Sequence, residues 1–158
     1  MRRWLSLLAA MLLVAASPRS LAEEPLLAVV VAAARGDQPG ADEIAQIFKR
    51  RKLFWSDGTR IQPVNLPADH PLRQRLTRQV LHQSAEAQQE YWNEQYFHGV
   101  LPPHVLASEE AMLRFVADTS AAIGYLPACP PDPRVRVVLL VTAEGRLLKP
   151  ETAPACGG

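Results

Sequence analysis

The feature that most constrains the fold is an unbroken apolar run near the start of the chain, at residues 26–34. The run is rich in Val, and β-branched residues favour strands. Because it lacks the apolar–polar alternation of a half-exposed strand, it is typical of a strand buried on both faces. The sequence therefore predicts a buried strand here and a largely buried sheet around it.

Strand and helix patterns alternate after this run, which indicates the α/β class, with a small mixed sheet flanked by helices. Two helix starts are marked by Ser84 and Ser108, because serine is a favoured N-cap residue. Each is followed by Glu in the first turn, where a negative charge is favourable for the helix dipole. We expect strands at 26–34, around 61–64, and at 122–126, 135–141 and 147–148, and helices that begin near residues 42, 71, 85 and 108.

Two side-chain patterns add detail to this outline. Pro63 cannot donate a backbone hydrogen bond, so its strand should be short or lie at an edge of the sheet. The helix over 85–98 carries four aromatic residues, and the helical spacing of Trp92 and Tyr96 predicts that they belong to the core.

The first 22 residues have the three parts of a secretory signal peptide. Arg2 and Arg3 precede an apolar stretch at 4–16, and small residues at Ser20 and Ala22 offer a cleavage site. The apolar stretch is too short for a membrane span, although an uncleaved N-terminal anchor is the alternative. We expect residues 1–22 to be removed, residues 23–150 to form one periplasmic domain, and residues 151–158 to be an irregular tail.

The charge of the chain argues against nucleic acid as a partner. The sequence has 17 Lys and Arg residues and 16 Asp and Glu residues. Loss of residues 1–22 removes Arg2, Arg3 and Arg19 and no acid, so the remaining domain is slightly acidic. Nucleic-acid-binding domains usually present a strongly basic face.

The two cysteines, Cys129 and Cys156, both lie in the Pro-rich C-terminal part of the chain. In an oxidising compartment we expect a disulfide between them, which would tie the tail back and stabilise the fold by about 2–4 kcal/mol. Two exposed thiols are the alternative.

The most informative loop follows the strand around Val64 and leads into the helix that begins at Pro71. Free backbone N–H groups and the positive end of the helix dipole make such a place suitable for an anion. In this reading the amides of the first helical turn donate to the anion, an arginine supplies the charge, and a histidine acts as cap or pH-sensitive contact. The candidate ligand-binding residues are Asn65, Asp69, His70, Leu72 and Arg73.

The order of these signals between residues 44 and 126 resembles the periplasmic phosphate-binding proteins of ABC transporters, which have the type 2 solute-binding fold. The matching pieces cover a little over half of the chain. They are residues 43–48, 54–58, 61–73, 91–92 with 97–99, 108–110 with 115–116, and 122–125.

The resemblance implies one lobe of a type 2 periplasmic binding protein, anion binding without catalysis, no cofactor, and a membrane transporter as a possible partner. Two departures stand beside it. The loop lacks the Ser-Gly-Thr type of run that binds phosphate in the family. Pro71 removes one backbone donor and Asp69 adds a negative charge. Arg73 could restore a bidentate contact. Two-lobed members are also roughly twice as long, so a single lobe would leave half of the cleft open to water.

Other chemistry has less support in the sequence. Glu90, Glu94 and His98 recur at helical spacing ahead of His104, and carboxylates with imidazoles can bind a divalent metal. No H-E-x-x-H or paired-Cys spacing accompanies them, and a polar helix face explains the same pattern, so we expect no metal. The chain also has no G-x-S-x-G turn, which argues against a hydrolase.

The sequence therefore supports two functions. The first is a secreted, non-enzymatic solute-binding protein that resembles the phosphate-binding family and holds a small anion at the loop 65–73. The alternative is an envelope interaction or regulatory module that keeps the lobe, has lost phosphate binding, and docks on an envelope protein or on its own copy as a homodimer.

Overall fold

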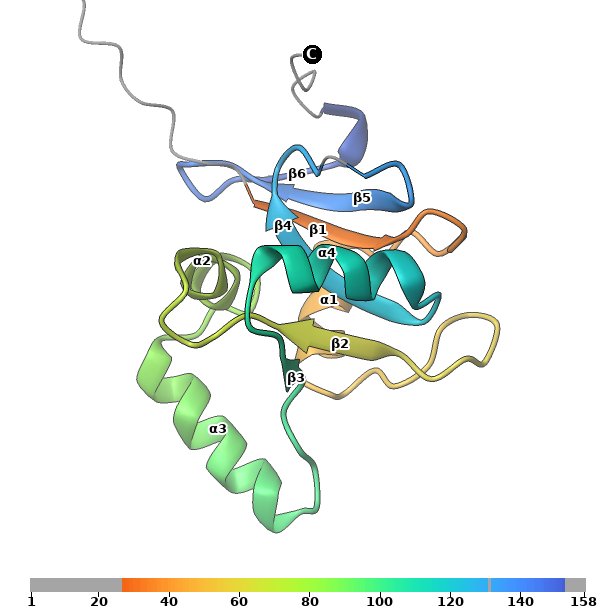
Figure 1. Ribbon diagram of the computed structural model, residues 1–158. Helices are drawn as coiled ribbons and strands as arrows, with labels where there is room; N and C mark the ends of the chain where they lie inside the picture. Colours follow the sequence, from red (N-terminus) through yellow and green to blue (C-terminus); the bar gives the residue numbers. More distant parts are fainter. Residues whose placement is uncertain (1–26, 131, 153–158) are drawn as a thin grey trace, which may run out of the picture.

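The computed structural model describes residues 27–130 and 132–152, which form one six-stranded sheet with helices on both faces (Figure 1). The expected α/β class with a mixed sheet is confirmed. The strand order is β3-β2-β4-β1-β5-β6; β2 is parallel to β3 and β4, and the other pairs are antiparallel. The elements are β1 (Leu27–Ala32), α1 (Ala41–Phe48), β2 (Gln62–Asn65), α2 (Pro71–Gln79), α3 (Ala85–Phe97), β3 (His104–Val105), α4 (Glu109–Asp118), β4 (Ala122–Pro127), β5 (Val135–Val141), β6 (Leu147–Leu148) and the 3₁₀ turn η1 (Pro150–Thr152).

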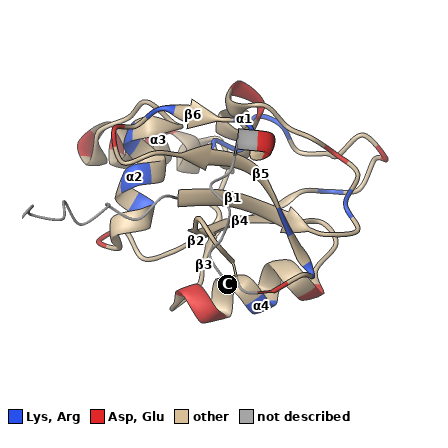
Figure 2. Cartoon of the chain, turned by 90° about the horizontal axis from the view of Figure 1, so that it is seen from above, with Lys and Arg blue, Asp and Glu red and all other residues tan. Residues whose placement is uncertain are grey.

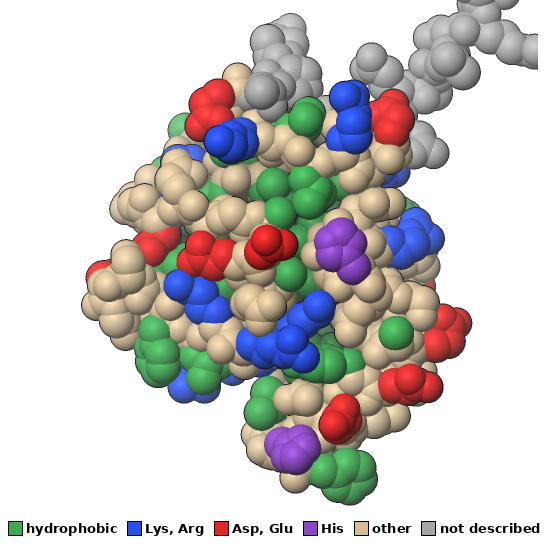
Figure 3. All heavy atoms as spheres, turned by 180° about the vertical axis from the view of Figure 1, so that it is seen from behind, with side chains coloured by type: hydrophobic (Ala, Val, Ile, Leu, Met, Phe, Trp, Pro, Cys, Tyr) green, Lys and Arg blue, Asp and Glu red, His purple; other side chains and the backbone are tan. Residues whose placement is uncertain are grey.

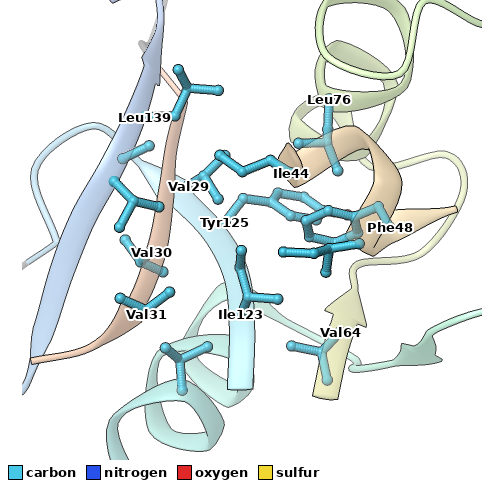
Figure 4. Close-up of a cluster of buried hydrophobic side chains, with 14 of the residues drawn as sticks. Val29, Val30, Val31, Ile44, Phe48, Val64, Leu76, Ile123, Tyr125 and Leu139 are labelled. Atoms are coloured by element: carbon cyan, nitrogen blue, oxygen red, sulfur yellow. The ribbon is translucent and has the colours of Figure 1, made fainter. Parts of the chain in front are cut away.

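Strand β1 is the buried strand that the apolar run predicts. All six of its residues are buried, and it pairs with β4 on one side and with β5 on the other. Its valines pack in the middle of the hydrophobic core (Figure 4). A strand with neighbours on both edges and helices on both faces has no contact with water, which explains why every position is apolar.

The two faces of the sheet are covered by different helices, with α4 in front of the sheet and α1 behind it in Figure 1. Successive residues of β4 point to opposite faces. Tyr125 packs on the α1 side, where its ring lies 5.9 Å from that of Phe48 in an edge-to-face arrangement. Gly124 points to the α4 side and leaves room for Met112 and Val116.

Pro63 fits its place in β2. This strand has four residues, and its pairing with β3 begins only at Val64, so the start of β2 has an uncovered outer edge. The N–H of Gln62 donates to the carbonyl oxygen of Ala121 at 3.0 Å, toward β4. The next residue faces the other way, so the missing N–H of Pro63 lies on the open edge, as predicted for a proline in a strand.

Helix α3 differs from the prediction. It has 13 residues and none of them is buried; Tyr96 is 67% exposed, so its assignment to the core is wrong, and Trp92 is only partly buried. The reason is that α1 and α2 already cover this face of the sheet, so α3 projects from the body beside α2 (Figure 1). Tyr91 provides one anchor, because its hydroxyl donates to the carbonyl oxygen of Lys49 at 2.7 Å.

The turn before β2 is held by a buried arginine. The Nη1 of Arg35 lies 2.8 Å from a carboxylate oxygen of Asp57, and its guanidinium lies over the ring of Trp55, 5.3 Å from the centroid. Hydrogen bonds from Thr59, and then from Arg35, lower the pKa of Asp57 to about 2. These contacts give the Trp-Ser-Asp-Gly segment at 55–58 a structural role.

Several expectations fall outside the described residues. They are the signal peptide at residues 1–22, residues 153–158 of the expected tail, and Cys156, so the Cys129–Cys156 disulfide stays a prediction. Within the described part of the chain, no helix is both long and apolar enough to cross a membrane.

Packing at Gly124 gives a test of this arrangement. We expect Gly124→Ala to destabilise the fold by about 1–3 kcal/mol, because overpacked cores cost that much. The added Cβ would lie 2.3 Å from the Sδ of Met112 and 3.0 Å from a methyl of Val116. Urea denaturation of the two proteins measures the difference. Gly36→Ala is the control, since its added Cβ meets no atom within 4 Å, and equal losses for both variants would contradict the packing of α4 on β4.

Candidate ligand site

The loop between β2 and α2 is fixed from inside the core by one tyrosine. The backbone N–H of Leu66 donates to the hydroxyl oxygen of Tyr125 at 2.9 Å, and this hydroxyl donates to Oδ1 of Asn65 at 3.2 Å. Burial raises the pKa of Tyr125 to about 12, so the phenol keeps its proton. Asn65 therefore has a structural partner inside the protein, and its side chain is buried.

The start of α2 is capped by the protein itself. His70 is the N-cap residue, and its Nδ1 accepts the backbone N–H of Leu72 at 3.2 Å, while Pro71 stands at the first helical position. The histidine therefore acts as the helix cap, which is one of the two roles that the sequence predicts for it. One of the amides that sequence analysis offered to an anion is therefore already bonded.

Negative charge also lies beside this helix start. The Nε2 of His70 lies 3.3 Å from a carboxylate oxygen of Glu109, at the start of α4. Asp69 is exposed in the loop itself. Two carboxylates near the amides oppose an anion there, and Glu109 was not among the predicted site residues because it is 39 positions from His70 in the sequence.

Arg73 is the one predicted site residue whose charged group lies inside the protein. It is only 8% exposed. Its Nη1 donates to the carbonyl oxygen of Leu66 at 3.0 Å, and its Nη2 donates to Oε1 of Gln88 on α3 at 3.2 Å. The third donor, Nε, is buried without a hydrogen-bond partner. Arg73 thus joins the β2–α2 loop to α3 and keeps one unsatisfied donor.

A cavity of about 720 Å³ lies beside Arg73, between α2, α3 and the segment that leads into β3. Trp92, on its α3 wall, has an indole Nε1 that is also buried without a partner. Figure 2 shows α2 with Lys and Arg colour and no Asp or Glu colour, so the α2 wall is basic. The lining residues are Ala68, Arg73, Gln74, Thr77, Arg78, Ser84, Ala85, Glu86, Gln88, Gln89, Trp92, Asn93, Pro102, Pro103 and Val105.

The predicted site residues thus lie together at one loop, but only Arg73 lines the cavity. Sequence reasoning missed Gln88 and assigned Trp92 to the core. The available signal was the i, i+4 spacing of these two residues, which places them on one face of α3. Within residues 27–130 and 132–152, no three His, Cys, Asp or Glu side chains are arranged to hold a metal ion.

Comparison with known proteins gives similarity at the level of the fold. No family model and no curated protein matches the chain. Among solved structures, a protein from Clostridium perfringens named for phosphate ABC transport and solved with bound phosphate aligns with a TM-score of 0.59 at 15% identity, over 73% of this chain and 46% of its own. An ABC-type phosphate transport receptor from Vibrio cholerae gives 0.55 at 16% identity, over 72% and 47%.

A third solved structure, from Planctomyces limnophilus and named as a possible phosphate-binding protein, aligns with a TM-score of 0.54 at 15% identity, over 74% of this chain and 42% of its own. This chain therefore spans less than half the length of each of these three proteins. At these identities the similarity establishes the fold alone. The described domain has the fold of one lobe of a periplasmic binding protein.

The Tyr125 hydroxyl gives a test of the loop geometry. We expect Tyr125→Phe to lower the free energy of unfolding by about 1–3 kcal/mol, because the amide of Leu66 loses its acceptor while it stays buried. Chemical denaturation measures the loss. Tyr96→Phe is the matched control, since Tyr96 is largely exposed. A Tyr125→Phe protein as stable as the control would contradict this account of how the loop is anchored.

Proposed function

We propose that this chain is a secreted, non-enzymatic solute-binding protein of the cell envelope, and that its ligand is a small anion, with phosphate the first candidate. The site consists of the loop from Asn65 through Asp69 and His70 to Leu72, together with the side chain of Arg73. The fold of the described domain supports a solute-binding role. The signal-like pattern at residues 1–22 supports a periplasmic location.

The observation that carries this proposal is the buried guanidinium of Arg73. Leaving a buried donor without a partner costs free energy, so Nε is a place where a ligand oxygen would be stabilising. Its Nη1 and Nη2 bond to a carbonyl oxygen and an amide oxygen, which are the kind of atom that an oxyanion would present. Gln88 can be displaced more easily than the backbone, so an anion that takes its place would gain two guanidinium contacts.

The open geometry predicts weak binding. The cavity beside Arg73 lies between two helices that make few contacts, and the exposed faces of α3 are in water. Charge-assisted bonds weaken as the local dielectric constant rises. The carboxylate of Glu109 next to His70 reduces the affinity further. A second surface that closes over the site, from a transporter or from another envelope protein, would strengthen it.

Calorimetry with inorganic phosphate tests the proposal on the exported protein. We expect heat that saturates at millimolar phosphate, and a loss of about tenfold or more in Arg73→Lys, because lysine keeps the charge and loses the planar fork of donors. Arg114→Gln is the control for overall charge, since Arg114 is exposed and paired with Glu110. Absence of heat and of a thermal shift at millimolar phosphate would refute the phosphate assignment.

The alternative function is a protein-interaction module, and one observation favours it. Four large apolar side chains stand exposed along one short stretch that runs from the end of α3 to β3, and Figure 3 shows hydrophobic side chains at the lower tip of the molecule, over the end of α3. Exposed apolar clusters commonly mark interaction sites. The four are Tyr96 at 67%, Phe97 at 86%, Leu101 at 62% and Val105 at 51% exposed.

Sedimentation velocity distinguishes this alternative. A homodimer should appear at micromolar concentration and dissociate in Phe97→Ser, because this side chain is the most exposed of the four. Phe54→Ser is the matched control, since Phe54 is 50% exposed but lies in the turn before β2. A monomer at every concentration, with or without the substitution, would exclude self-association as the role of this surface.

A further inference from the structure

A second cationic cavity lies at the start of β2, apart from Arg73. It has a volume of about 440 Å³ and is lined by Arg50, Arg60 and His104, by the exposed Gln62, and by apolar side chains that include Leu101 and Phe115. No Asp or Glu occurs among the described residues that line it. It opens where β3 does not yet cover β2.

Its two arginines have no anionic partner in the described part of the chain. By contrast, Arg35, Arg114 and Arg134 each pair with a carboxylate. Burial, and then the charge of Arg60, lower the pKa of the Arg50 guanidinium, whereas Arg60 itself is exposed. The Nε of Arg50 is buried without a hydrogen-bond partner.

The backbone at Arg50 adds a separate observation. Arg50 has φ 59°, in the left-handed region, directly after the helix α1 and its C-cap Lys49. The N–H groups of Arg50 and Arg51 bond back to the carbonyl oxygens of Ile47 and Gln46, as at a helix end that normally takes glycine. An arginine here is less favourable for the backbone than glycine, which indicates that its side chain serves another purpose.

We propose that the cavity of Arg50, Arg60 and His104 binds a small polyvalent oxyanion, with the two guanidinium groups as charge partners. An oxyanion would remove the repulsion between Arg50 and Arg60 and would give the buried Nε of Arg50 an acceptor. Phosphoryl and carboxylate ligands both offer this chemistry. The site is independent of the loop at Arg73, because the two cavities share only the prolines at 102 and 103.

The test is calorimetry of the exported protein with pyrophosphate in one arm and citrate in the other. It is done in the Arg73→Lys background, in which binding at the first site is weakened. We expect one of the two ligands to bind, and Arg50→Gly and Arg60→Gln each to weaken it by about tenfold or more, as for the loss of a charge-assisted hydrogen bond. Arg50→Gly should also melt at the same temperature or higher, because glycine suits the left-handed backbone.

His82→Gly is the matched control for the backbone change. His82 is the other described residue with a positive φ that is not glycine, at 53°, and it does not line this cavity. The proposal requires full binding in His82→Gly and lost binding in both arginine variants. It is overturned if neither ligand gives heat, or if Arg50→Gly and Arg60→Gln bind as well as His82→Gly. These outcomes do not depend on whether Arg73 binds phosphate.

Discussion

The position of the β2–α2 loop depends on one buried phenol, the side chain of Tyr125, whose hydroxyl needs hydrogen-bond partners. Tyr125 lies in the core between α1, α2 and the sheet (Figure 4), and a hydroxyl there must have hydrogen-bond partners. It finds them in the side chain of Asn65 and the backbone of Leu66, which draws the end of β2 inward. The inward turn places the carbonyl oxygen of Leu66 where Arg73 donates to it, so the orientation of that arginine follows from the tyrosine.

Features that depend on residues near one another in the sequence were predictable, and features that depend on contacts between distant segments, such as those of Tyr125, were not. The strand at 27–32, the caps at His70, Ser84 and Ser108 and the open edge at Pro63 follow from local rules, and the structure has them where expected. The exposure of α3 was not predictable, because aromatic spacing on a helix does not tell whether a free face of the sheet remains for it. The candidate site was partly predictable: its loop lies as one unit, but Gln88 and Glu109 reach it through contacts between distant segments.

Most buried polar groups of the domain have hydrogen-bond partners, but two parts of its surface carry buried polar groups without partners or exposed apolar rings. Beside the larger cavity, Arg73 on α2 and Trp92 on α3 each have one buried nitrogen without a hydrogen-bond partner. The smaller cavity is lined by two arginines that pair with no carboxylate among the described residues, and the end of α3 has exposed aromatic rings. Buried groups without partners and exposed apolar rings are both unfavourable in an isolated domain. A ligand or partner that binds them in the folded state alone would stabilise that state, by an amount that grows with the logarithm of its concentration once this exceeds the dissociation constant.

The proline at the start of β2 has a consequence for assembly. A sheet whose outermost strand has only two residues leaves part of its neighbour open, and an open edge can recruit strands from other molecules into aggregates. At this position the backbone N–H that would donate to an incoming strand is missing, because the residue that faces the open edge is Pro63, whose ring nitrogen carries no hydrogen. The protein can therefore keep an accessible pocket at a sheet edge without offering a template for polymerisation.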